Sequence, residues 1–264
     1  MRDIIVSCIK KRSDNALVTF LLEFSGVSTV ATMYGTFFEN FALRRLAAGG
    51  KFPIKRLKDK DATVLDSSAR KTPRGLKDGY LQFPCFEIQR HTSLAAITDA
   101  VNAATRSPHT GDTGSSGSPP KPLLLLPESK SFCFVDAFIL APSGAHPYTV
   151  FLANATTDAT HSIKVRDRRS ESESSDDGTA KYEGGLAAVV KKLDANKDVD
   201  SDVCMLWLVP PATYDLMEFA APFRVDDPIK KKIDRIAAME KHPVCKRVVQ
   251  YALCIDFSSA GSGV

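Results

Sequence analysis

The sequence of 264 residues lacks the motifs that identify most catalytic sites. Its six cysteines form no CxxC pair and no Cys-His cluster at metal-ligand spacing, which argues against a zinc site. No GxxxxGKS/T loop, GxGxxG turn, HExxH helix, GxSxG elbow or Ser-His-Asp order occurs. Interpretations of the chain as an ATPase, a dinucleotide enzyme or a protease therefore have no residues to support them.

Long apolar runs and an excess of one charge are also missing. No apolar span is long enough for a membrane helix, and the amino-terminal MRDIIVSCIKKR carries no readable export signal, so we expect no membrane partner. The 35 basic residues are nearly matched by 31 acids, which permits nucleic-acid binding without requiring it. With 44% hydrophobic residues we expect a folded core that contains reduced cysteines.

The periodicity of apolar residues predicts a mixed α/β chain. Residues 28–48 have the spacing of a helix, and Gly49-Gly50 directly after them is a stop signal. Helices are predicted at 14–24, 28–48, 93–104, 186–196, 214–223 (capped by Thr213) and 229–242. Strands are predicted at 51–58, 80–89, 123–126, 132–139, 148–156, 203–209 and 248–257.

A predicted hairpin from Phe132 to Thr156, FCFVDAFILAPSGAHPYTVFLANAT, is the centre of the functional argument. Its first apolar run is interrupted by a single carboxylate, Asp136, and a buried acid needs a partner, a proton or a metal. Its second run ends in Asn154 and Thr156, which share one face by strand alternation. The hairpin is therefore expected to gather three polar side chains at one place.

Two further acids have two interpretations each. Glu39 lies among the aromatic residues of the 28–48 helix, either facing solvent or pointing from the edge of the apolar face toward a site. Asp158, in the segment TTDAT, is either a turn or cap residue, which the neighbouring residues favour, or a further ligand.

The chain divides into one large domain and two small ends. Residues 1–24 are interpreted as a helical remnant or connector, 25–257 as the domain, and 258–264 as a disordered tail. Flexible insertions are expected at 106–122, which is rich in Gly, Ser and Pro, and at 166–179, where Ser and Glu alternate.

The order of helix, three strands, helix and strand, with an acid on the second strand, is that of restriction-endonuclease-like PD-(D/E)xK nucleases, here with an additional carboxyl-terminal helical and strand segment. More narrowly, FFENFALRRLAAGGKFPIKRL, FVDAFIL, FLANATTDATHSIK and VCMLWLVPP resemble the carboxyl-terminal nuclease-like region of Crinkler effectors and trypanosome retrotransposon-hot-spot proteins. The resemblance runs from about Val30 to Phe219. An ATPase module commonly precedes this region in the family, and it is not in this sequence.

The resemblance implies Mg²⁺-dependent hydrolysis of DNA, if the site is active, by a secreted effector that works in the nucleus of a host cell. It makes Asp136 and the helix acid Glu39 metal ligands, with Asn154 as a third. The family pattern has an acid and a lysine where this chain has Asn154 and Thr156, so the site is degenerate.

Two residues beyond the third strand are further candidates for the site. His161 is a candidate base or phosphate contact and Lys164 a candidate displaced lysine, and for each a plain surface role is an equal alternative. The competing hypotheses for the whole chain are an inactive module that binds DNA or a host protein, and a decayed family member that is poorly soluble.

Overall fold

The computed structural model describes residues 14–24, 31–58, 76–77, 79–105, 122–128, 135–142, 148–159, 163–166, 186, 189–190, 203–221, 223–225 and 248–257. Several sequence predictions lie outside these residues: the segments 1–13, 106–121, 167–179 and 258–264, and the 229–242 helix. No helix among the described residues is long and apolar enough to cross a membrane.

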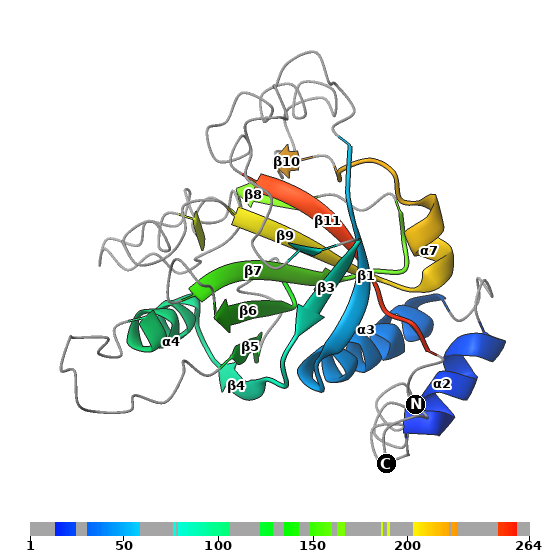
Figure 1. Ribbon diagram of the computed structural model, residues 1–264, viewed down its shortest axis with the longest axis horizontal. Coiled ribbons are helices and arrows are strands. Elements are labelled where there is room, and N and C mark those ends of the chain that lie inside the picture. Colours follow the sequence, from blue (N-terminus) through cyan, green and yellow to red (C-terminus); the bar gives the residue numbers. More distant parts are fainter. Residues whose placement is uncertain are drawn as a thin grey trace, which may run out of the picture.

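A nine-stranded mixed sheet forms the centre of the protein (Figure 1). Its strand order is β2-β3-β1-β11-β9-β7-β6-β5-β4. The strands β7, β9 and β11 are parallel to one another, as are β4 and β5, and the other neighbours are antiparallel. The bounds are β1 Gly50–Arg56, β2 Leu76–Lys77, β3 Tyr80–Phe83, β4 Glu87–His91, β5 Leu123–Pro127, β6 Ala137–Pro142, β7 Tyr148–Ala155, β9 Val203–Val209 and β11 Val248–Cys254.

A second, two-stranded parallel sheet pairs β8 (Ile163–Arg166) with β10 (Phe223–Val225). The helices are α2 (Asp14–Glu23), α3 (Ala31–Ala47), α4 (Leu94–Thr105) and the short α7 (Pro211–Leu216). The mixed α/β architecture predicted from periodicity is confirmed.

Strand alternation gives the large sheet two apolar faces, each with its own core. The face that packs against α2 and α3, called the α3 face, contains Leu124, Ile139, Phe151, Ala153, Leu206 and Tyr251. The face that packs against α4, called the α4 face, contains Leu125, Phe138, Leu152, Trp207 and Ala252. The sheet is curved toward α3, because Phe83 of β3 contacts Phe151 of β7 at a ring-centroid distance of 5.7 Å although three strands lie between them in the sheet.

The joint at the end of α3 holds this helix against the curved sheet. Gly49 has φ 72°, and an added Cβ there would lie 2.5 Å from the carbonyl oxygen of Pro84, so only glycine fits. The Arg45 guanidinium donates to the Gly49 carbonyl at 2.7 Å, and the Phe86 amide donates to the Ala47 carbonyl at 2.9 Å. The predicted stop at Gly49-Gly50 is confirmed, and the joint places α3 next to the start of β4.

A buried amide organises the α4 face. Gln250 of β11 is only 4% exposed. Its Oε1 accepts hydrogen bonds from Trp207 Nε1 and from the Ala221 amide, both at 2.9 Å, and its Nε2 donates to the Ala221 carbonyl at 3.0 Å. Because each of these groups is buried, the network satisfies polar atoms that would otherwise be costly.

Two element predictions were wrong. The segment predicted as one strand at 80–89 forms β3 and β4, which pair with β1 and with β5 and so lie at different places in the sheet. Pro84 has no amide hydrogen for a continuous ladder. Thr213 does not cap a helix, because α7 already begins at Pro211 and the Thr213 hydroxyl donates to the Thr157 carbonyl at 3.0 Å.

Candidate functional site

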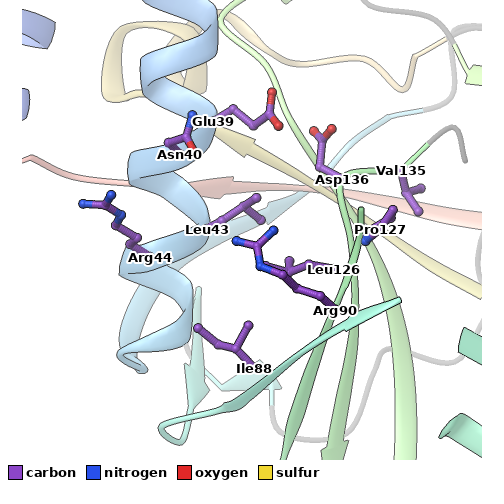
Figure 2. A pocket seen from close by; sticks show the side chains of 10 residues that line it. All are labelled: Glu39, Asn40, Leu43, Arg44, Ile88, Arg90, Leu126, Pro127, Val135 and Asp136. Atoms are coloured by element: carbon purple, nitrogen blue, oxygen red, sulfur yellow. The ribbon is translucent and has the colours of Figure 1, made fainter. Parts of the chain in front are cut away.

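A pocket of about 300 Å³ lies between α3 and the neighbouring strands β4, β5 and β6 (Figure 2). Its charged and amide side chains come from α3, β4 and the residue before β6, and apolar side chains form the rest of its wall. The lining residues are Glu39, Asn40, Leu43, Arg44, Ile88, Arg90, Leu126, Pro127, Val135 and Asp136.

Asp136 is held in place by the end of β7. Its amide donates to the Ala153 carbonyl at 2.9 Å, and its Oδ2 accepts from the Ala155 amide at 2.8 Å. The side chain thus takes the place of a ladder carbonyl at the point where β6 begins. A carboxylate that accepts a backbone hydrogen bond has a defined orientation, and here the half-buried group lines the pocket.

Glu39 enters the same pocket from α3. Its helix neighbours Phe38 and Phe41 are buried in the α3 core, whereas Glu39 itself is half-buried and one turn from the pocket residue Leu43. Figure 2 shows the carboxylates of Glu39 and Asp136 pointing toward one another from α3 and from the start of β6. Two acids that are about a hundred residues apart in sequence therefore share one site.

Two arginines differ in their relation to this site. Arg90 of β4 extends toward α3, and its guanidinium lies in the pocket beside the apolar Leu43 and Leu126 (Figure 2). Arg44 is on the rim and points away from the two carboxylates. The pocket therefore combines a pair of carboxylates with one inward-pointing cation, an arrangement suited to a metal ion and an anion together.

Asn154 and Thr156 are not among the residues that line the pocket with Asp136 and Glu39. On β7, Phe151 and Ala153 pack on the α3 face, and strand alternation assigns Asn154 and Thr156 to the α4 face. In register, Asn154 is next to Trp207 of that face.

Thr156 has a structural contact set. Its Oγ1 accepts from the Asp158 amide at 3.0 Å, its amide donates to the Leu208 carbonyl at 3.0 Å, and its side chain is buried. These contacts form a turn at the end of β7, and the exposed Asp158 belongs to that turn. The turn interpretation of Asp158 agrees with this geometry.

The two candidates beyond the third strand are His161 and Lys164. His161 lies outside the described residues. Lys164 is in β8, where its backbone is paired with Arg224 of β10 in the small sheet. Sequence analysis missed Arg90, although the alternation in EIQRH places Ile88 and Arg90 on one face of a strand.

The donor set suits a hard divalent ion held mainly by water. Mg²⁺ is commonly bound by one or two carboxylates and keeps several water molecules, and Glu39 with Asp136 supplies two. In the part of the chain that is described, no three His, Cys, Asp or Glu side chains come together as a metal-binding group.

Comparisons of the chain with protein-family models, with curated proteins and with solved structures found no match. The resemblance to Crinkler and retrotransposon-hot-spot proteins consequently rests on the sequence segments alone.

Proposed function

We propose that the protein is a nuclease-like domain that binds DNA at this pocket and, if active, hydrolyses phosphodiester bonds with Mg²⁺. The observation that carries the proposal is the pair of facing carboxylates, Glu39 and Asp136, in a pocket that also contains Arg90. When bound, Mg²⁺ would lower the pKa of the attacking water and offset negative charge on the phosphate.

The order of elements around the pocket supports a PD-(D/E)xK arrangement. The helix α3 precedes three consecutive antiparallel strands, β5, β6 and β7. The connection from β7 to its parallel neighbour β9 includes buried helical residues on the α4 face. Asp136 precedes the second of the three strands, as the first metal ligand does in the nucleases that the sequence resembles.

The roles of the chain's own residues follow from their contacts. Asp136 is oriented by the Ala155 amide, so its carboxylate is held at a fixed place relative to β7. Glu39 is carried by α3, whose end is packed against the connection from β3 to β4 at Gly49. Two acids fixed on different elements favour binding of a cation between them, since each supplies an oxygen ligand without rearrangement of the backbone.

The test is nicking of supercoiled plasmid DNA in the presence of Mg²⁺ or Mn²⁺. The parent is expected to nick only with metal, and Glu39→Gln and Asp136→Asn are expected to lose activity by about a hundredfold, because each removes one anionic ligand. Glu87→Gln is the matched control, because this exposed acid at the start of β4 does not line the pocket. Equal activity of the parent and Asp136→Asn would exclude the enzymatic proposal.

A second candidate function is binding without cleavage. The β7 positions on the α3 face are Ala153 and Ala155, so this strand adds neither a second acid nor a lysine on that face. A parent that binds DNA with a steep salt dependence but never nicks it would be a DNA-binding module. Absence of any DNA affinity at low salt would instead favour a module that binds a protein.

A further inference from the structure

We propose that Arg90 is the phosphate-binding residue of this pocket and supplies, from β4, the positive charge that the third strand lacks. This inference rests on the proposed function and deepens it, because it names the group that binds the substrate anion. A phosphate placed beside two carboxylates is repelled by them unless cations offset that repulsion. Glu39 and Asp136 would hold a divalent ion whose charge offsets their own, so the phosphate would need a further cation from the protein.

The strand expected to supply that cation does not do so. Ala153 and Ala155 occupy the α3 face of β7, and Lys164 belongs to the small sheet. Arg90 lines the same pocket as both acids and its guanidinium points into it (Figure 2). Among the described residues, Arg90 is therefore a cation that is well placed to bind an anion in this pocket.

The position of Arg90 in the sheet explains why it reaches the pocket. Arg90 is paired with Leu126 and Ile88 with Leu124, and both leucines belong to the α3 core. The Arg90 side chain thus leaves β4 on the face that α3 covers, and its aliphatic part can lie along apolar surface while the guanidinium stays polar. A planar guanidinium binds two phosphate oxygens at once, which orients the phosphate as well as attracting it.

The walls of the pocket indicate which ligand accompanies the phosphate. In Figure 2 the carboxylates, the Arg90 guanidinium and the Ile88 side chain follow one another along the pocket. Ile88 is 50% exposed, an apolar surface at the end opposite the acids. A volume of about 300 Å³ is at the lower end of the range for ligand pockets, so it suits one nucleotide unit, with its phosphate at Arg90 and its sugar and base toward Ile88.

The experiment measures binding of thymidine 3′,5′-bisphosphate by calorimetry with Mn²⁺ present. Arg90→Gln is expected to weaken binding at least about tenfold, and Arg90→Lys to an intermediate degree, because lysine keeps the charge but loses the paired hydrogen bonds. Arg56→Gln is the control, because this exposed arginine of β1 does not line the pocket. The affinity of the Arg56→Gln variant for the bisphosphate should stay within about twofold of the parent's. Equal affinity of Arg90→Gln and the parent overturns the assignment.

Two further measurements separate this inference from the proposed function. Binding of Mn²⁺ alone, followed by electron paramagnetic resonance, should be lost in Glu39→Gln and Asp136→Asn but retained in Arg90→Gln. The double variant Glu39→Gln/Asp136→Asn, which lacks the repelling charges, should bind the bisphosphate without metal, and adding Arg90→Gln should abolish that binding. If the parent does not bind Mn²⁺ but this Arg90-dependent binding remains, the metal proposal fails alone. If neither the parent nor the double variant binds the bisphosphate, the Arg90 assignment fails.

Discussion

The two faces of the large sheet use polar side chains in opposite ways. On the α4 face, Gln250 is buried and its amide is bonded to Trp207 and to both backbone groups of Ala221. At the margin of the α3 face, Glu39 and Asp136 are half-buried and line a pocket. On one face the polar side chain is fully hydrogen-bonded inside the core, whereas on the other the polar side chains border a space that a ligand could occupy.

The largest effect on stability is expected from Gln250→Leu. The change leaves the Trp207 indole N–H and the Ala221 amide and carbonyl without their bonds in a buried site, so unfolding should become easier by about 3–4 kcal/mol. Urea unfolding followed by circular dichroism measures it. The control is Gln82→Leu, at an exposed position of β3, which should change stability by less than about 0.5 kcal/mol. Equal effects of the two would contradict the structural role of Gln250.

On the α3 face the strongest effect is expected at the joint rather than in the pocket. Gly49→Ala combines φ 72° with a Cβ 2.5 Å from the Pro84 oxygen, and should cost about 2–3 kcal/mol. Gly79→Ala has a similar φ of 74° but nothing within 4 Å of the added Cβ, so its cost is about 1 kcal/mol. The difference between their unfolding midpoints isolates the steric contact from the backbone conformation, and a zero difference would mean that the joint yields.

The buried hydroxyl of Tyr251 should make stability depend on pH in the alkaline range. Burial, with a smaller contribution from Cys204, raises the pKa of Tyr251 to about 12, and its hydroxyl has no hydrogen-bond partner among the described residues. Because the unfolded tyrosine ionises near pH 10 and the folded one does not, the free energy of unfolding should decrease as pH rises from about 10 to 12, by about 2 kcal/mol. Tyr251→Phe should remove this contribution and cost little at pH 7. An unchanged alkaline slope in Tyr251→Phe would assign the effect to other groups.

The smallest stability effect is expected at the pocket itself. Asp136→Asn retains an oxygen that can accept from the Ala155 amide, so its unfolding free energy should stay within about 1 kcal/mol of the parent's. Asp136→Ala removes the acceptor and should cost about 1–3 kcal/mol. The two faces should then respond differently: Asp136→Asn should lose Mn²⁺ binding and keep its stability, whereas Gln250→Leu should lose stability. A large loss of stability in Asp136→Asn would instead give this acid a structural role.

The cysteines test how far composition predicts environment. Cys204 and Cys254 are buried free thiols, as expected, whereas Cys85 is exposed in the connection from β3 to β4. Burial, followed by the nearby Asp256 and Asp215, raises the pKa of Cys254 to about 11, so at pH 8 it should react with a thiol reagent far more slowly than Cys85.

Periodicity and turn residues were sufficient to predict much of the fold. The α3 helix with its glycine stop, the central strand β9, the last strand β11, and the antiparallel pairing of β6 with β7 were all predicted, because each depends on local patterns. The division of 80–89 into β3 and β4 was not predicted, since the strand residues on either side of Pro84 look alike in sequence although they pair with different strands.

The candidate site was predicted in part. Asp136 and Glu39 were both identified as candidates, and they share one pocket. Asn154 and Thr156 were assigned to the same place because they are polar and share a face. The run Val150-Phe151-Leu152-Ala153 is apolar on both faces, so its alternation does not reveal which face meets α3. Arg90 was missed because an exposed arginine on a short strand has no distinguishing local pattern.

By itself the sequence determined most of the helices and strands, where α3 ends, and which acids interrupt apolar segments. These features follow from local sterics and from the period of apolar side chains. Only the tertiary structure decided which of the polar residues meet. The order of nine strands and the curvature of the sheet around α3 bring Glu39, Arg90 and Asp136 together from three separate elements and assign Asn154 and Thr156 to the opposite face. Long-range pairing depends on the packing of the whole core, and no segment of the chain contains that information alone.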